Sequence, residues 1–229
     1  MTTIGGKSPV LKVRLAGTMQ RPGFFGKIYI GYPKRGLDLL LCTLSMISIV
    51  PVLVVVATIV AIDGGWPFYG HERIGQHGRR FKCLKFRTMR KDSAAALENL
   101  LARDPAAAAE WATSHKLTND PRITRMGKWL RRTSLDELPQ LINVLRGEMS
   151  LVGPRPVTED ELAKYAEHLP KYLALRPGLT GVWQVHGRGL VGYPERVEMD
   201  AHYFLTASFF GDLRLMLLTS QVVLKRRGQ

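Results

Sequence analysis

The hydrophobic pattern of the chain is dominated by one run of 24 residues without a charge, from position 39 to position 62. As a straight helix this run would extend about 36 Å, which is long enough to cross a bilayer. Pro51 lies at its thirteenth position, where a proline removes a helical hydrogen bond and crowds the preceding turn. The pattern therefore predicts a membrane helix that bends at Pro51.

Both flanks of this run are basic, whereas a spanning helix is expected to carry its Lys and Arg mainly on one side. Residues 1–36 contain seven Lys or Arg and no acid, and residues 64–92 contain eight against Glu72 and Asp92. Two topologies fit these flanks. One is a re-entrant helix that dips into one leaflet, turns at Pro51 and returns to the same face. The other is an ordinary spanning helix with a tolerated proline kink.

Downstream of the apolar run, alternating residues predict a β-hairpin. Residues 67–73 and 80–89 have the composition of two short strands, with the turn at 74–78. Because side chains alternate along a strand, four residues of the second strand share one face: Phe81, Cys83, Lys85 and Arg87. The charges of Lys85 and Arg87 are explained equally well by a strand face that is exposed to solvent.

Helical periodicity predicts three further segments, at residues 92–114, 121–132 and 213–224. The last two are basic and amphipathic, a pattern typical of helices that lie flat on an anionic membrane. The four tryptophans, Trp183 among them, are expected to be core or interfacial anchors. The expected fold class is therefore α+β, mainly helical and monotopic, with interfacial helices and a small hairpin.

Composition adds a strong positive charge to this picture. The chain has 229 residues, enough for one globular unit, and its two cysteines, Cys42 and Cys83, are expected to stay reduced. Its 33 Lys and Arg against 19 Asp and Glu give a net charge of +14, which predicts an anionic partner. The basic clusters adjoin apolar runs, and no helix-turn-helix, RNP or zinc-finger pattern accompanies them. Lipid and phosphate are therefore the expected partners, and nucleic acid is not.

Two adjacent acids, Asp136 and Glu137, stand beside two arginines in this basic chain. One interpretation is helix capping, because Ser134 and Glu137 have capping-box spacing and the apolar stripe of a helix follows them. Pro139 argues against it, since a proline fits the first position of a helix better than the fifth. If the helix starts at Pro139, both acids lie on its approach, where phosphate or a metal-bound phosphate can be held.

The segment around this pair, together with segments before and after it, resembles a known enzyme family. The matching motifs are residues 85–89 (KFRTM), 134–140 (SLDELPQ), 143–147 (NVLRG), 149–156 (MSLVGPRP), 176–181 (RPGLTG) and 184–188 (QVHGR). In this order they resemble the bacterial sugar transferases called monotopic phosphoglycosyl transferases, over about residues 33–227. The resemblance implies an enzyme of exopolysaccharide biosynthesis that moves a hexose 1-phosphate, of galactose or glucose, from a UDP-sugar to polyprenyl phosphate and releases UMP.

The resemblance also implies roles for individual residues. Asp136 is the expected nucleophile, giving a covalent aspartyl-phosphosugar, and Asp136 and Glu137 are the expected ligands of a Mg²⁺ cofactor. Six further residues match positions that handle phosphate or the nucleotide sugar: Lys85, Arg87, Arg155, Gln184, Arg188 and Asp200. Simpler interpretations remain for two of them, since Arg155 between prolines also suits a rigid turn and Asp200 also suits a helix surface.

The expected organisation is a basic N-terminal lead-in (residues 1–32), a re-entrant membrane helix (33–63) and a catalytic domain (64–229). A soluble UDP-sugar and a lipid phosphate must meet at one interface, which favours re-entry and a catalytic domain on the cytoplasmic face of the bacterial inner membrane. The family usually has a Ser-Pro pair at the bend, whereas here Val50 precedes Pro51. A homodimer would be ordinary. The alternative function is a non-catalytic basic scaffold that binds anionic lipid or a polysaccharide-synthesis partner.

Overall fold

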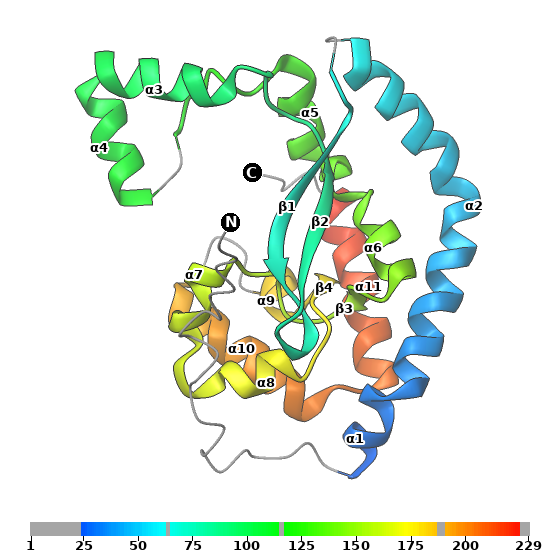
Figure 1. Cartoon of the computed structure of the whole chain (residues 1–229). Helices are drawn as coiled ribbons and strands as arrows, with labels where there is room; N and C mark the ends of the chain where they lie inside the picture. The colour runs from blue at the N-terminus through cyan, green and yellow to red at the C-terminus, as the bar shows by residue number, and fades with distance from the viewer. Residues whose placement is uncertain (1–23, 63–64, 115–116, 187–190, 225–229) are drawn as a thin grey trace, which may run out of the picture.

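The computed structural model describes residues 24–62, 65–114, 117–186 and 191–224. Most of these residues are helical, and a short β-hairpin lies near the centre of the molecule (Figure 1). The mainly helical fold with a small hairpin is therefore confirmed. Most of the predicted basic lead-in, residues 1–23, lies outside the described residues, and the short helix α1 (Phe24–Ile30) occupies the rest of it.

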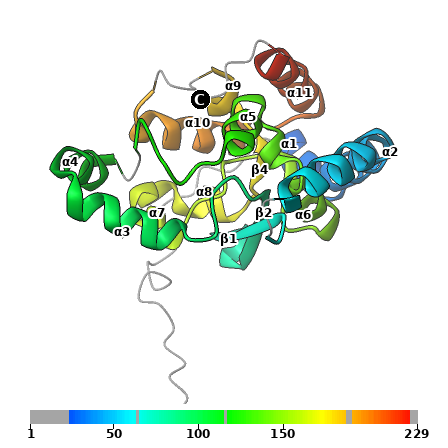
Figure 2. The ribbon, with the colours of Figure 1, turned by 90° about the horizontal axis from the view of Figure 1, so that it is seen from above.

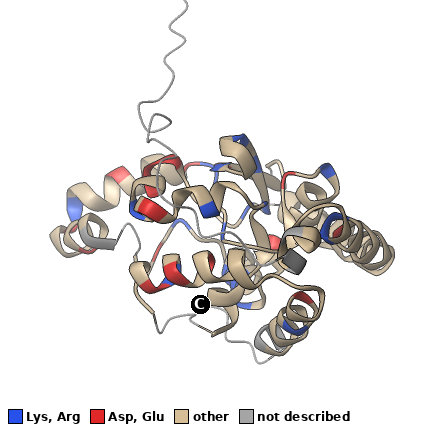
Figure 3. Ribbon diagram, turned by 90° about the horizontal axis from the view of Figure 1, so that it is seen from below, with Lys and Arg blue, Asp and Glu red and all other residues tan. Residues whose placement is uncertain are grey.

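The apolar run forms most of α2 (Tyr32–Ile62), which extends along one edge of the molecule (Figure 1). By length and composition α2 is able to cross a membrane. Figure 3 shows it almost free of charged residues over most of its length. Many of its large apolar side chains are exposed, among them Leu40, Leu44, Ile47, Val54 and Val55. This exposed apolar face is compatible with association with a membrane.

The helix α2 is continuous through Pro51, and it curves along its length instead of breaking there (Figure 1). A proline removes only one hydrogen bond from this 31-residue helix. Beyond the proline, Leu53, Val56 and Val60 are buried in one cluster with Phe86 and Leu130. This packing holds the second half of α2 against the body of the protein, so the predicted sharp bend is present only as curvature.

The predicted hairpin is confirmed, with β1 (Phe68–Ile74) antiparallel to β2 (Arg80–Phe86). The turn passes through a 3₁₀ segment, Gln76–Gly78, in which Gly78 has a φ of 75°. The second strand ends three residues earlier than the predicted end at position 89. From Arg87 onward the chain therefore no longer follows the alternation of a strand.

A second, smaller sheet was not predicted from the sequence. It pairs β3 (Ser150–Val152) in parallel with β4 (Gly178–Thr180). The two backbones approach closely because both sides carry glycine: a Cβ on Gly178 would lie 2.1 Å from the backbone nitrogen of Gly153. Strands of three residues show no usable periodicity, so this contact becomes visible only in three dimensions.

Helices surround the two sheets. Between the hairpin and β3 these are α3 (Ser93–Arg103), α4 (Pro105–Ser114), α5 (Arg125–Thr133) and α6 (Gln140–Arg146). Those after it are α7 (Glu159–Leu162), a 3₁₀ segment η4 (Ala163–His168), α8 (Leu169–Leu173), α9 (Val182–His186), α10 (Tyr193–Thr206) and α11 (Phe209–Leu224). The predicted helices at 92–114 and 121–132 are thus found, the first as a pair that projects from the body (Figures 1 and 2). The C-terminal helix begins four residues earlier than predicted.

Buried polar contacts fix α2 against the rest of the fold. Asp212 of α11 accepts hydrogen bonds from the hydroxyls of Tyr29 and Tyr203, each 2.8 Å long, and forms a buried ion pair with Lys34. Arg35 donates to the backbone carbonyl of Val144 at the end of α6, at 2.7 Å. These contacts place α6, and the segment that precedes it, directly beside α2.

Candidate functional site

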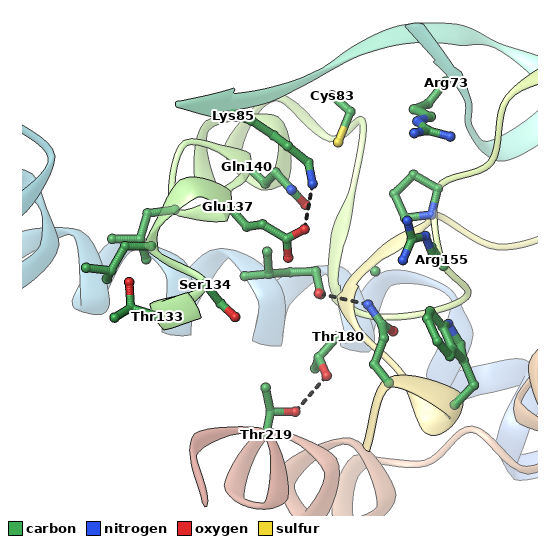
Figure 4. A pocket seen from close by; sticks show the side chains of 17 residues that line it. Arg73, Cys83, Lys85, Thr133, Ser134, Glu137, Gln140, Arg155, Thr180 and Thr219 are labelled. Carbon is green, nitrogen blue, oxygen red and sulfur yellow. Dashed lines mark hydrogen bonds and ion pairs between the residues drawn. The ribbon is translucent and has the colours of Figure 1, made fainter. Parts of the chain in front are cut away.

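A pocket of about 260 Å³ opens between the hairpin, the segment before α6, the strand β4 and the helices α9 and α11 (Figure 4). Charged side chains enter it from two sides. Lys85 and Glu137 lie at one end, and Arg73 and Arg155 lie at the other (Figure 4). The pocket thus joins an end that contains a lysine and a glutamate to an end that contains two arginines.

The two adjacent acids lie on a 3₁₀ turn, η3 (Leu135–Glu137), between α5 and α6. The helix α5 ends at Ser134, whose φ of 57° reverses the chain direction, and Pro139 precedes the first residue of α6. The prediction that Asp136 and Glu137 lie on the approach to a helix starting near Pro139 is therefore confirmed. Ser134 makes no capping hydrogen bond through its side chain, so the capping-box interpretation was wrong.

The position of this turn depends on close packing of α5. The hydroxyl of Thr124 caps the helix by accepting a hydrogen bond from the backbone N–H of Gly127, at 2.9 Å. A Cβ on Gly127 would lie 2.0 Å from the carbonyl oxygen of Thr88, so only glycine allows this approach to the chain that leaves the hairpin. The cap fixes the start of α5, and the close approach of Gly127 to Thr88 places the helix beside the end of the hairpin. The turn η3 follows directly from α5.

The carboxyl group of Asp136 is largely removed from water, with 9% of the residue exposed. Burial is the main cause that raises the pKa of Asp136 from 3.8 to about 6; Lys85 opposes the shift and Glu137 adds to it. The ammonium of Lys85 lies 2.6 Å from a carboxylate oxygen of Glu137. The pocket is thus lined by one ion-paired acid, Glu137, and by Lys85. Asp136 is not among its lining residues; its desolvated carboxyl group lies beside the pocket, close enough to interact with both.

At the other end of the pocket, Arg155 is fixed between two prolines directly after β3. Its guanidinium carbon lies 5.5 Å from the centre of the Trp183 ring. Asp200 of α10 is 3% exposed and accepts a hydrogen bond of 2.8 Å from the hydroxyl of Tyr165. Burial raises the pKa of Asp200 to about 7, and a hydrogen bond from the backbone N–H of Arg155 opposes that shift. Asp200 therefore lies behind the Arg155 segment, and its interpretation as a helix-surface acid was wrong.

The other residues singled out from the sequence are not all in the pocket. Gln184 lines it and donates to the carbonyl of Leu179, at 3.2 Å. Arg87 follows the end of β2 and donates to the carbonyls of Val60 and Trp66, at 2.9 and 3.2 Å, beside the end of α2. The prediction that Arg87 and Lys85 share one strand face is therefore wrong, because β2 ends at Phe86, between them. Arg188 lies outside the described residues.

Several pocket residues were missed in the sequence. Arg73 opposes Phe81 across the hairpin, a pairing that depends on a strand register that was not predicted from the sequence. Thr180 and Thr219, whose hydroxyls are 2.6 Å apart, come from β4 and α11 and meet only through tertiary packing. Trp183, interpreted as an anchor, lines the pocket.

The donor set suits a hard divalent cation that shares its coordination with a substrate. Asp136 and Glu137 are adjacent on one turn and offer carboxylate oxygens, the ligands that Mg²⁺ prefers. Among the described residues no group of three or more His, Cys, Asp or Glu side chains could hold a metal. Mg²⁺ is commonly bound through one or two carboxylates, with water and phosphate oxygens completing the shell, so the pair fits this mode.

Comparison with known proteins finds a matching family and several similar proteins. Residues 29–226 match the family described as bacterial sugar transferase. A "UDP-galactose-lipid carrier transferase" of Erwinia amylovora is 52% identical over 195 residues, which are 85% of this chain and 41% of the relative. An "undecaprenyl-phosphate galactose phosphotransferase" of Salmonella typhimurium is 47% identical over the same shares of each protein. The "exopolysaccharide production protein ExoY" of Sinorhizobium fredii is 49% identical over 86% of this chain and 88% of the relative. The chain thus spans about two fifths of the first two relatives and most of the third.

The raised pKa of Asp136 leads to a stability prediction. At high pH the buried carboxyl group is charged in the folded state, and burying this charge costs free energy. Asp136→Asn removes the charge, so it should raise the free energy of unfolding at pH 8 by up to about 3 kcal/mol. The gain should shrink as the pH falls through about 6 and vanish below about 4, where the acid is protonated in both states. Denaturant unfolding in detergent without divalent cations measures it, with Asp160→Asn, at an exposed position, as the control. A gain that is the same at pH 4 and pH 8 would contradict the assignment.

Proposed function

Because this chain belongs to the bacterial sugar transferase family, we propose that it transfers a hexose 1-phosphate from a UDP-sugar to polyprenyl phosphate and releases UMP. The observation that carries the proposal is the buried Asp136 beside the Lys85–Glu137 ion pair, which lines a pocket that also contains arginines. The names of the relatives support the same donor and acceptor classes, with galactose or glucose as the hexose. The reaction would be an early membrane step of exopolysaccharide synthesis, as the name of the ExoY relative supports.

In the first step, a carboxylate oxygen of Asp136 attacks the β-phosphorus of the UDP-sugar. A new oxygen–phosphorus bond forms, and the bond to the bridging oxygen breaks, so UMP leaves with that electron pair. In the second step, a phosphate oxygen of polyprenyl phosphate attacks the phosphorus held on Asp136, and the Asp136 carboxylate is released unchanged. Two displacements with a covalent intermediate constitute ping-pong catalysis.

The environment of Asp136 suits this role. Burial strips water from the carboxylate, which makes its attack on an anionic phosphate depend on nearby cations. Lys85 is the closest such cation to the acidic pair, and Arg73 and Arg155 extend positive charge along the pocket. Lys85 also keeps part of the Asp136 population charged, because it opposes the effect of burial on the pKa. Arg188, assigned from the family resemblance, would add a further cation.

Asp136 and Glu137 would hold Mg²⁺, which when bound supplies positive charge to the diphosphate. Glu137 is exposed enough to reach a ligand in the pocket and is now paired with Lys85 at 2.6 Å. A divalent cation on Glu137 would free the ammonium of Lys85 to contact a phosphate oxygen. In this arrangement Glu137 positions the cation and Lys85, whereas Asp136 makes the covalent bond.

The proposed location is the cytoplasmic face of the bacterial inner membrane, with α2 as a re-entrant anchor. The exposed apolar face of α2 supports contact with lipid, and α11 adds Phe210, which is 79% exposed. The pocket is close to this anchor, because α6 and the turn before it pack on α2. Polyprenyl phosphate could therefore arrive from the bilayer while UDP-sugar arrives from the cytosol.

The covalent intermediate gives the decisive test of function. Purified protein incubated with UDP-galactose or UDP-glucose should gain the mass of one hexose phosphate on the peptide that contains Asp136. Asp136→Asn should abolish the adduct and lower UMP release by about 10⁴-fold. Asp160→Asn, which removes an exposed acid, should leave both unchanged. A non-catalytic scaffold would release no UMP with any UDP-sugar, and normal turnover by Asp136→Asn would remove the mechanism.

The re-entrant topology has an independent test at the two ends of α2. Tyr32 and Trp66 are 94% and 76% exposed, and the native cysteines are buried, so single cysteines at these positions can be labelled selectively. An impermeant maleimide should label neither Tyr32→Cys nor Trp66→Cys in intact spheroplasts and should label both in inverted vesicles. Labelling of just one of them in spheroplasts would show that α2 spans the membrane.

A further inference from the structure

Buried N–H groups without an acceptor lie at and behind one wall of the pocket, on Trp183, which lines it, and on Arg196, which contacts Trp183. Among the described residues, the buried side-chain atoms that lack a hydrogen-bond partner are Trp183 Nε1, Gln184 Oε1, and Nε and Nη2 of Arg196. Three of these four atoms are donors, and they belong to two side chains in contact with each other. Native proteins rarely leave buried donors unpaired, because the lost hydration is not replaced. Such donors indicate that an acceptor is supplied from outside the chain.

The two side chains form a stack with a second arginine. The guanidinium carbon of Arg196 lies 4.8 Å from the centre of the Trp183 ring and 4.9 Å from that of Tyr193. The guanidinium of Arg155 lies over the same indole ring, at 5.5 Å. Two cations therefore share one aromatic ring, and Arg196 is only 8% exposed. Their mutual repulsion favours an anion that binds both.

The neighbouring carboxylates are bonded to other groups. Glu161 accepts from Arg73, at 3.2 Å, and from the backbone N–H of Thr158, at 2.9 Å. Asp200 accepts from the hydroxyl of Tyr165, at 2.8 Å. No side-chain hydrogen bond joins either acid to Arg155 or Arg196 among the described residues. Both acids lie close enough to Arg196 to interact with its charge, but they leave its unpaired N–H groups without an acceptor.

We propose that Arg196 and Trp183, together with Arg155, bind a phosphate group of a substrate. This inference rests on the proposed transferase function and adds two binding residues to its site. Three unpaired N–H donors, two of them on one guanidinium group, match the oxygens of a phosphate monoester. The two Arg196 nitrogens are covered in this structure, so binding would require the side chains around them to move.

The position of the stack favours the phosphate of the nucleotide over that of the lipid. Arg196 belongs to α10, on the side of the pocket toward α7 and α8, whereas η3 and α6 lie beside α2 (Figure 1). A lipid phosphate that enters along α2 meets Asp136 and Lys85 first. The stack at the opposite end would then bind the phosphate that leaves as part of UMP.

Calorimetric titration of the purified full chain with UMP, uridine and geranyl phosphate tests this assignment. Arg196→Gln should weaken UMP binding by about tenfold or more, since it removes a charged donor pair. Trp183→Phe keeps an aromatic ring and removes the N–H, so it should weaken UMP binding several-fold. Arg196→Lys keeps the charge, so its affinity for UMP should lie between those of the wild type and Arg196→Gln. Uridine, which lacks phosphate, should bind all variants equally. Lys164→Gln removes an exposed charge beside Tyr193 and should bind UMP like the wild type.

The outcomes separate the site from the proposed reaction. The phosphate site is wrong if Arg196→Lys and Trp183→Phe bind UMP and geranyl phosphate like the wild type. It is also wrong if their affinity for uridine falls as much as their affinity for UMP. If their affinity falls for geranyl phosphate and not for UMP, the site is supported and its phosphate belongs to the lipid. If UMP affinity depends on Arg196 while wild-type protein forms no Asp136 adduct, the phosphate site stands and the transferase function fails.

Discussion

The structure depends on one costly arrangement, the burial of the Asp136 carboxyl group beside a charged pocket. A carboxylate withdrawn from water is unstable unless cations stand near it, and Lys85 is held in place by its ion pair with Glu137. The backbone is built around this position, with a left-handed residue, Ser134, directly after α5 and Pro139 directly before α6. A pocket of this kind is suited to an anionic substrate that completes the neutralisation.

The same arrangement relates the pocket to the membrane. Arg35 and the apolar cluster around Leu130 hold the turn of Asp136 next to α2, whose outward side is apolar and exposed. The arginine stack of Arg155 and Arg196 lies toward α10. In the proposed reaction, the lipid substrate and the soluble one would therefore approach the buried acid from different ends of one pocket.

Local chemistry explains what the sequence allowed us to predict. The apolar run, the hairpin and the turn before Pro139 follow from periodicity and proline geometry, which act over a few residues. Arg87 was misplaced because β2 ends at Phe86, a boundary set by tertiary contacts. The burial of Asp200 and the stack of Arg196 on Trp183 depend on helices brought together from distant segments, so no spacing in the chain reveals them.

The central claim is that Asp136 forms a bond to phosphorus before the lipid acceptor takes part. Rapid-quench measurement of UMP release, with UDP-sugar and without polyprenyl phosphate, tests it most directly. The account predicts a burst that approaches one UMP per active site, followed by continued release only when the acceptor is added. Absence of any UMP until the acceptor is present, in protein that then turns over normally, would show direct transfer between the substrates and contradict the account.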